Sequence, residues 1–391
     1  MSRLRVGRRT FVKNLAATAA AASAFPAAAA GLTTRLEASP GPSGASQAPP
    51  SKPRIRFSVI GLNHDHITGM TNAVIRGGGD LVAVYAKEPE LAAAYAKRFP
   101  QVKIARSEQE VLESDVQLVL SAAIPDERAP IGIRVMQHGK DYLSDKPGIT
   151  TLEQLAEARR VQAQTKQIYS ILYSERHEVR AAVRAGDLVQ AGAIGRVIQT
   201  VNLAPHRIGN VAGGARPEWF WHKARYGGIL VDIGSHQVDQ FLFYTGSTKA
   251  EVVSSQTGNV AHHDKPEFED FGDMVLRGNA GAGYVRLDWF TPNGLSTWGD
   301  GRLTILGTEG YIELRKYVDI AGRPGGDHLF IVDQKETRYI DCKDGDLPFG
   351  PRLVSDIVNR TETAMPQAHT FLTMELVLKA QAQAQPLTMK G

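Results

Sequence analysis

Between about residue 54 and residue 175, short apolar runs alternate with segments whose apolar residues recur at helical spacing. The runs that predict buried strands are Arg54–Gly61, Leu81–Tyr85, Val116–Leu120, Asp141–Leu143 and Tyr169–Tyr173. The segments that predict helices are His66–Arg76, Pro89–Phe99, Ile131–His138 and Leu152–Thr165. Strands and helices that alternate in this way form right-handed crossovers and a parallel, doubly wound sheet. Residues 54–175 are therefore predicted to form a Rossmann-type α/β domain.

The pattern changes after residue 175. A helix is predicted over Val179–Gln190 and a strand over Gly195–Val201, and strands that alternate apolar and polar positions then follow between Glu251 and Ile340. This pattern predicts an α+β domain over residues 176–350, with a large, mainly antiparallel open sheet. Residues 351–391 predict a helical segment that Pro366 divides in two. A small ligand is expected in the cleft between the two domains.

Residues 1–30 have the order of an export signal. Arg8 and Arg9 form a pair near the start, and an alanine-rich stretch extends to Ala30, which predicts a twin-arginine signal peptide. An uncleaved basic tail is the alternative. Residues 31–53 are rich in Pro, Gly and Ser and predict a linker. We therefore expect export to the periplasm by the twin-arginine machinery.

The net charge of +4 comes from this leader. Without its five bases, 40 basic residues face 41 acidic ones, so bulk charge gives no reason to expect a nucleic acid partner. Cys342 is the single cysteine and does not report the redox compartment. No later apolar segment is long enough to cross a bilayer, so no membrane role is expected once the signal is removed.

The turn after the first strand is a degenerate dinucleotide-binding motif. Of the three glycines in G-x-G-x-x-G it keeps only Gly61, while Asn63 and His66 occupy the other two positions. Asn tolerates a left-handed backbone, and the amides at the start of the next helix still face a phosphate. The expected ribose-binding acid after the second strand is missing, because Ala86 and Lys87 stand there. Lys87 favours NADP over NAD if it binds a 2′-phosphate, and is otherwise a solvated surface residue.

His64 and His66 invite a metal interpretation, together with His206, His222 or His236. The spacing His-x-His without a cysteine pair or a His-Glu-x-x-His motif is not specific, so we predict no metal. These two histidines are instead expected to line the cofactor turn.

The segment Gly227–Asp239 is the richest in candidate chemistry. If it is helical, Asp232 and His236 share a face, so that the carboxylate orients an imidazole that exchanges a proton with substrate. Asp239 lies three residues further along, on roughly the same side. The structural alternative is a helix-capping Asp232 and an interior His236.

The sequence resembles the Gfo/Idh/MocA family (glucose-fructose oxidoreductase, inositol dehydrogenase and MocA) over nearly all of the chain after the linker. The resemblance rests on the Ile60-Gly61 turn, Asp145-Lys146-Pro147, Gly192-Ala193-Ile194-Gly195, the Gly-Gly-x-x-x-Asp-x-Gly-x-His-x-x-Asp run from Gly227 to Asp239, and Leu306-Gly307-Thr308-Glu309-Gly310. It implies an NAD(P)-dependent oxidoreductase in which Lys146 contacts the reacting hydroxyl and the nicotinamide ribose, His236 is the general acid and base, and Asp232 is the partner of His236. The expected cofactor-binding residues are Gly61, Asn63, His64, His66, Ala86, Lys87, Pro125, Lys146 and Pro147.

The family acts mostly on sugars and cyclitols, so a secondary hydroxyl of a sugar, cyclitol or glycoside is the expected substrate group. The residues expected to contact it are Arg176, His206, Trp219, Trp221 and Asp239. Because no free dinucleotide pool exists outside the cytoplasm, an exported enzyme of this kind needs tightly bound NAD or NADP and a closed redox cycle. A homo-oligomer, dimer or tetramer, is expected through the open sheet face.

Two other functions remain open at this point. One is a glycosidase or lyase that uses bound NAD transiently, with His236 or His66 also performing the elimination. The other is a non-catalytic carbohydrate-binding protein on the same fold.

Overall fold

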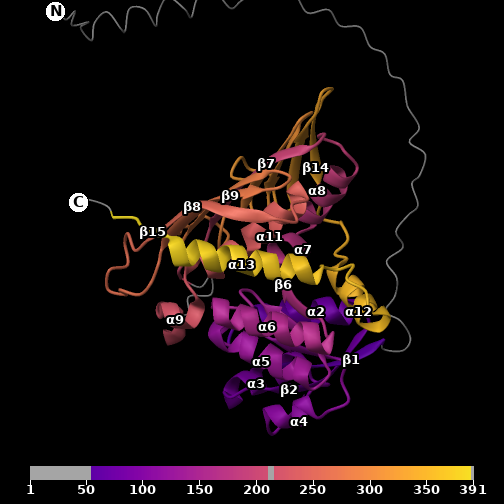
Figure 1. Ribbon diagram of the computed structural model, residues 1–391. Coiled ribbons are helices and arrows are strands. Elements are labelled where there is room, and N and C mark those ends of the chain that lie inside the picture. Colours follow the sequence, from indigo (N-terminus) through magenta and orange to yellow (C-terminus); the bar gives the residue numbers. More distant parts are fainter. Residues whose placement is uncertain (1–53, 210–214, 389–391) are drawn as a thin grey trace, which may run out of the picture. The chain divides into compact units, whose positions relative to one another are not determined.

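The first domain of the computed structural model is a six-stranded parallel sheet (Figure 1). The structure describes residues 54–209 and 215–388, so the expected signal and the whole expected linker lie outside it. The strand order is β3-β2-β1-β4-β5-β6, and every pair is parallel. Its strands are β1 (Ile55–Ile60), β2 (Gly79–Tyr85), β3 (Lys103–Ile104), β4 (Leu118–Ser121), β5 (Asp141–Asp145) and β6 (Tyr169–Leu172). The predicted doubly wound domain is confirmed.

Helices cover both faces of this sheet, which is why its central strands are apolar on both sides. All four residues of β4 are buried. The helices of the domain are α2 (His66–Arg76), α3 (Pro89–Arg98), α4 (Glu108–Leu112), α5 (Pro125–Gln137) and α6 (Leu152–Thr165). Helix α5 begins six residues before the predicted start, because Pro125 occupies its first turn, where the missing N–H costs nothing.

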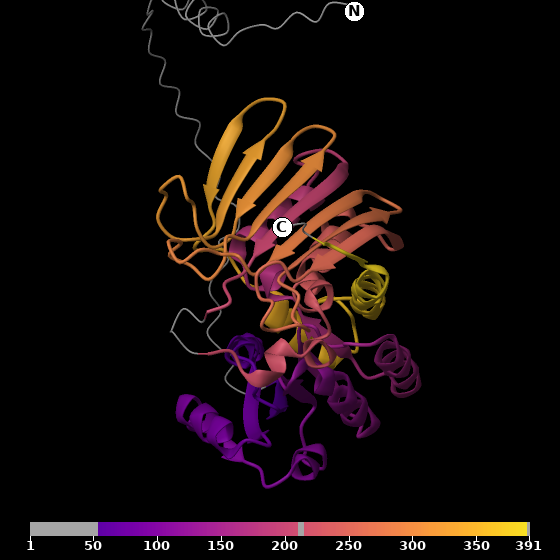
Figure 2. The ribbon, with the colours of Figure 1, turned by 90° about the vertical axis from the view of Figure 1, so that its left-hand side faces the viewer.

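The second domain is built on a nine-stranded sheet with the order β14-β13-β12-β11-β7-β10-β9-β8-β15. Its strands are β7 (Val197–Pro205), β8 (Ala250–Gly258), β9 (Phe271–Gly278), β10 (Ala282–Asp288), β11 (Arg302–Gly307), β12 (Tyr311–Arg315), β13 (His328–Val332), β14 (Thr337–Asp341) and β15 (Gln385–Pro386). Most pairs are antiparallel, as predicted, but β10 runs parallel to β7 and β15 runs parallel to β8. Figure 2 shows the long strands side by side.

Helices cover one face of the nine-stranded sheet. Helix α11 (Gly234–Thr245) packs on β7 and β10, and α8 (Arg180–Gln190) packs on β12 and β13. The remaining short helices are α7 (Ser174–His177), η1 (Glu218–Trp221), α9 (Lys223–Tyr226) and α10 (Ile229–Asp232). Of these short helices, α7, η1 and α10 carry residues of the candidate site.

The C-terminal segment joins the two domains. Helix α12 (Phe349–Asn359) packs on α2 of the first domain, while α13 (Gln367–Gln383) contacts α6 of the first domain and both α11 and β8 of the second (Figure 1). All the described residues belong to one compact unit. Among them, no helix is long and apolar enough to cross a membrane.

Candidate active site

A cavity opens at the carboxyl ends of β1, β2 and β4. This is the edge at which an open parallel sheet binds its ligands. Gly61 follows β1 with φ of +83°, and a Cβ on it would lie 2.5 Å from the Cβ of Ala123. The residue at this position therefore has to be glycine, which brings the backbone of the turn close to the sheet. The cavity is lined by Gly61, Asn63, Ala86, Lys87, Glu88, Ala123, Glu127 and Arg134, among others. Four predicted cofactor residues, Gly61, Asn63, Ala86 and Lys87, thus face one space.

Acidic groups and paired bases surround this cavity. Lys87 Nζ donates to Glu127 Oε2 at 2.7 Å, and Arg134 Nε lies 2.6 Å from Glu108 Oε1. Glu88, three residues after β2, accepts a hydrogen bond from Asn63 Nδ2 at 2.9 Å. Ala86 and Lys87 directly follow β2, as expected from the sequence, but Glu88 supplies an acid to the same cavity and was not predicted.

A second cavity lies between the two sheets. The first domain contributes His64, His66, Pro125, Arg128 and Lys146 to its lining. Glu175, shortly after β6, also lines it, and the second domain contributes His206, Arg207, Arg216, Trp219, Asp232, His236, Trp289, Trp298 and Tyr317. The turn from Gly61 to His66 thus borders both cavities, its first half facing one and its second half facing the other.

Lys146 occupies the wall of this second cavity, one residue after β5. Its Nζ donates to Asp232 Oδ1 at 2.9 Å, and both residues are buried. Burial raises the pKa of the Asp232 carboxyl, but the adjacent Lys146 ammonium outweighs it and lowers that pKa below its ordinary value. The two side chains therefore form a buried ion pair that fixes the position of the ammonium.

The predicted pairing of Asp232 with His236 is wrong. Ile233, between α10 and α11, keeps a helical backbone with φ of −82° and ψ of −44°, but the Asp232 carboxylate accepts from Lys146 and not from His236. His236 is 2% exposed, and its Nδ1 has no hydrogen-bond partner among the described residues. Burial lowers the pKa of His236 to about 3, which keeps the imidazole neutral at neutral pH.

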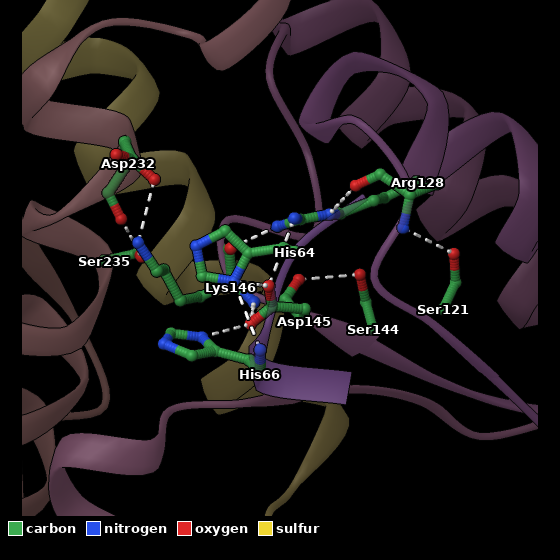
Figure 3. A network of polar contacts seen from close by, with 10 residues as sticks. His64, His66, Ser121, Arg128, Ser144, Asp145, Lys146, Asp232 and Ser235 are labelled. Carbon is green, nitrogen blue, oxygen red and sulfur yellow. Dashed lines mark hydrogen bonds and ion pairs between the residues drawn. The ribbon is translucent and has the colours of Figure 1, made fainter. Parts of the chain in front are cut away.

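Asp145 is the centre of a polar network on the other side of Lys146 (Figure 3). Its Oδ1 contacts His66 Nδ1 at 2.9 Å and accepts from the backbone N–H of Lys146 at 2.8 Å. His64 and Arg128 approach its Oδ2 within ion-pair distance, at 3.2 and 3.1 Å, without forming a well-directed hydrogen bond. Burial raises the pKa of Asp145, but Arg128 and the two imidazoles outweigh it and hold the pKa well below its ordinary value. Burial, together with His66, lowers the pKa of His64 to about 4.

His64, His66 and Asp145 each offer one ligand atom within 4.8 Å of the others, which is close enough to hold a metal ion. The same carboxylate already contacts Arg128 and the Lys146 amide. A divalent cation bound there would be repelled by the guanidinium of Arg128. We therefore continue to predict no metal at this position.

The predicted substrate residues divide into two groups. His206 and Trp219 line the cavity between the sheets. Trp221 does not, because it packs on Phe220 and Phe268. Arg176 and Asp239 do not line this cavity either: Arg176 Nε donates to Asp239 Oδ2 at 2.6 Å in the interior, and His369 Nε2 lies 2.8 Å from Asp239 Oδ1. These three residues therefore lie outside the cavity that His206 and Trp219 line.

Several lining residues were absent from the sequence-based prediction. They are Arg128, Glu175, Trp289, Trp298 and Tyr317. They come from loops and strand ends that are far apart in the chain, and none belongs to a spaced motif. Arg207 and Arg216 line the cavity too, and they lie in segments that mix aromatic and polar residues as a sugar-binding wall does. Pro147, predicted to contact the cofactor, lines neither cavity.

Comparison with known proteins decides the family. Residues 182–313 match the family model described as the GFO/IDH/MocA C-terminal domain. A candidate oxidoreductase from Erwinia carotovora atroseptica SCRI1043 is 45% identical over 85% of this chain and 100% of its own, with a TM-score of 0.82. The chain belongs to the Gfo/Idh/MocA family of oxidoreductases.

Two more distant structures share the fold of this Gfo/Idh/MocA oxidoreductase. A candidate oxidoreductase from Thermotoga maritima is 19% identical over 84% of this chain and 97% of its own, with a TM-score of 0.72. A levoglucosan dehydrogenase, solved with NADH and levoglucosan, is 16% identical over 84% of this chain and 97% of its own, with a TM-score of 0.69. No curated protein matches the sequence.

Proposed function

We propose that this protein is an NAD(P)-dependent oxidoreductase that acts on a secondary hydroxyl of a sugar, cyclitol or glycoside. The observation that carries the proposal is the Lys146–Asp232 ion pair, 2.9 Å long, in a cavity that also holds neutral His236. An immobilised ammonium stabilises the negative charge that develops on a hydroxyl oxygen, and a neutral imidazole takes up its proton. The solved levoglucosan dehydrogenase, with its NADH and its sugar, supports the same class of reaction.

The cavity beside Gly61 fits a dinucleotide. The backbone approach at Gly61 and the amino end of α2 suit a pyrophosphate, and the groove continues past Ala86 and Glu88. A bound nicotinamide would supply the hydride acceptor. Asn63, His64 and His66 would hold the cofactor along the turn, and Lys146 would face its ribose.

The charges around this cavity favour NAD over NADP. A 2′-phosphate needs an available base, but Lys87 is already bound to Glu127, and Arg134 to Glu108. Glu88 carries no cationic partner among the described residues and suits the two hydroxyls of an unphosphorylated ribose.

The residues of the chain divide the proton chemistry between them. Asp232 holds Lys146 Nζ in place, so the ammonium donates to the substrate oxygen without reorganising. His236, buried and neutral, accepts the hydroxyl proton. Trp219 and His206 enclose the substrate and exclude water from the forming alkoxide.

A second candidate is elimination or hydrolysis in which the cofactor is reduced and then reoxidised. The Asp145 network favours it, because it places two further imidazoles in the same cavity as His236. Release of an aglycone from a glycoside with no net change in absorbance at 340 nm distinguishes this candidate from net oxidation.

We further propose export by the twin-arginine route and a cofactor that stays bound through turnover. Both rest on the leader Arg8-Arg9 and the alanine-rich stretch after it. A homo-oligomer is proposed as well, because large apolar side chains remain exposed on strands of the nine-stranded sheet. They include Ile198, Val253, Val275, Leu306, Tyr311 and Tyr339.

The deciding experiment is to purify the mature protein from the periplasm, denature it, and identify released nucleotides by mass spectrometry. We expect NAD in a stoichiometric amount, and titration calorimetry of emptied protein should show tighter binding of NAD than of NADP. A protein that is empty and binds neither nucleotide contradicts the oxidoreductase proposal. Elemental analysis of the same sample should find no bound transition metal.

A further inference from the structure

The cavity between the sheets holds more positive charge than its own carboxylates neutralise. Three of the cations around it are each paired with a carboxylate. The pairs are Arg128 with Asp145 at 3.1 Å, Lys146 with Asp232 at 2.9 Å, and Lys316 with Glu175 at 2.8 Å. Burial alone would raise the pKa of Glu175, but Lys316 outweighs it and lowers that pKa. Each of these pairs has no net charge, and within each pair the carboxylate fixes the position of the cation.

Arg207 and Arg216 differ from these three cations. Both line the cavity, and within residues 54–209 and 215–388 neither lies within ion-pair distance of a carboxylate. Arg207 Nη2 donates to two backbone carbonyls, of Pro292 and Leu295, while its Nε is buried without a partner. Asp65 also lines the cavity, yet no ion pair joins it to either arginine.

Arg216 is held mainly by neutral groups. Its Nε donates to the carbonyl of Ile208 at 2.7 Å and its Nη2 to that of Arg207 at 2.9 Å. Its guanidinium lies 4.7 Å from the centroid of Phe220 and 5.1 Å from that of Trp289. Carbonyl and ring contacts fix the direction of a guanidinium but do not cancel its charge, and burial lowers the pKa of Arg216.

We propose that this cavity binds a polyhydroxy substrate carrying a negatively charged group, a carboxylate or a phosphate, and that Arg207 and Arg216 hold that group. The inference rests on the proposed function, because it names the substrate class for the same site. Both guanidinium groups are half-buried and line one cavity, and a guanidinium binds a carboxylate or a phosphate most strongly where water is excluded. With the anion held by the arginines and the reacting hydroxyl at Lys146, the distance between the two groups selects which carbon reacts.

The test uses matched pairs of probes on the purified protein, with and without NADH. Titration calorimetry compares D-glucuronate with D-glucuronamide, and D-glucose 6-phosphate with D-glucose, while UDP-glucuronate tests whether the charge belongs to a nucleotide. Protein that is emptied of nucleotide and reloaded with NADH cannot oxidise these alcohols, so binding alone is measured. We expect a charged probe to bind at least about 10-fold more tightly than its neutral partner, and added salt to reduce that difference.

The variants Arg207→Gln and Arg216→Gln should each weaken binding of the charged probe about 10- to 100-fold and leave the neutral probe unchanged. Arg207→Lys and Arg216→Lys should retain part of the affinity. The control Arg277→Gln removes the same charge from the surface of β9, where Arg277 is 68% exposed, and should change nothing. Circular dichroism and the melting temperature show whether each variant folds.

Equal binding of charged and neutral probes, binding of neutral probes only, an equal loss of both in the glutamine variants, or no binding of any charged probe would each overturn the inference. If NADH still binds and a neutral sugar is oxidised, the proposed function stands and only the substrate class is wrong. If NADH does not bind, the proposed function itself fails, whatever the sugars do.

Discussion

The two cavities share the turn from Gly61 to His66 but differ in how their charges are arranged. In the nucleotide cavity both bases, Lys87 and Arg134, are already bound to acids. In the cavity between the sheets, Arg207 and Arg216 have no carboxylate partner among the described residues. A paired charge mainly fixes geometry, whereas an unpaired charge in a cavity is available to a ligand. This difference underlies our two proposals, NAD for the first cavity and an anionic substrate for the second.

Replacing Lys146 should have the largest effect, because it should impair catalysis in the cavity between the sheets and leave nucleotide binding in the other cavity nearly unchanged. Lys146→Met removes the ammonium that stabilises the forming alkoxide, so kcat/KM should fall about 1,000-fold or more. NAD reduction at 340 nm with the probe that binds best measures this loss. Binding of NAD should change only a few-fold, because Gly61 and Glu88 are untouched. Lys103→Met, at a lysine that is 71% exposed, serves as the control. Full activity in Lys146→Met would remove Lys146 from the reaction.

The Asp145 network should matter for stability as well as for chemistry. Asp145→Asn leaves the fully buried Arg128 without its counter-charge, which should lower the free energy of unfolding by about 3–5 kcal/mol. Urea denaturation followed by circular dichroism measures the change. Asp115→Asn breaks the exposed Arg56–Asp115 pair and should cost less than about 1 kcal/mol. Similar losses in the two variants would mean that the buried network adds no stability.

Buried histidines around the second cavity predict a loss of stability in acid. Burial lowers the pKa of His236 to about 3 and that of His206 to about 4, below the ordinary histidine value of 6.5. Between these values the unfolded chain binds protons that the folded chain does not, so stability falls as pH drops below 6.5.

Each such residue contributes at most about 1.4 kcal/mol per pH unit over that range. Urea denaturation at pH 7 and pH 5 should therefore show a smaller difference for His236→Asn than for the unmodified protein. His138→Asn, at an exposed histidine, should leave the difference unchanged. A slope that His236→Asn does not alter would place the proton uptake elsewhere.

Replacing Glu88 should have a smaller effect, on the preference of the nucleotide cavity for NAD over NADP. Glu88→Gln removes the acid that faces the ribose and keeps an amide for Asn63, so the preference for NAD over NADP should shrink about 10-fold. Calorimetry with both nucleotides measures this ratio. An unchanged ratio would mean that another residue excludes the 2′-phosphate.

Lys87 should show the smallest effect. Its side chain is 65% exposed and paired with Glu127, so Lys87→Met should change NADP affinity less than about 3-fold. A 10-fold or larger loss of NADP binding would instead restore the interpretation of Lys87 as a 2′-phosphate ligand.

Local pattern was enough to predict the elements and the carriers of the chemistry. The predicted helix His66–Arg76 is confirmed to the residue, because its apolar positions recur at helical spacing after the strand that ends at Ile60. Lys146, Asp232 and His236 could be singled out because they belong to spaced motifs. The partner of Asp232 could not, because Lys146 lies 86 positions away in the chain and only the tertiary structure brings its ammonium to the carboxylate.

The sequence by itself determined the two domain types, the glycine turn and the family, because these depend on periodicity and short-range spacing. Only the tertiary structure decided which charges meet. It joined Lys146 to Asp232 across 86 positions and Arg176 to Asp239 across 63, and it returned Glu88 to the nucleotide cavity. It also left Arg207 and Arg216 facing the cavity without carboxylate partners in the described part of the chain. Electrostatic pairing depends on distance in space, and that distance is set by how the two sheets and their loops pack.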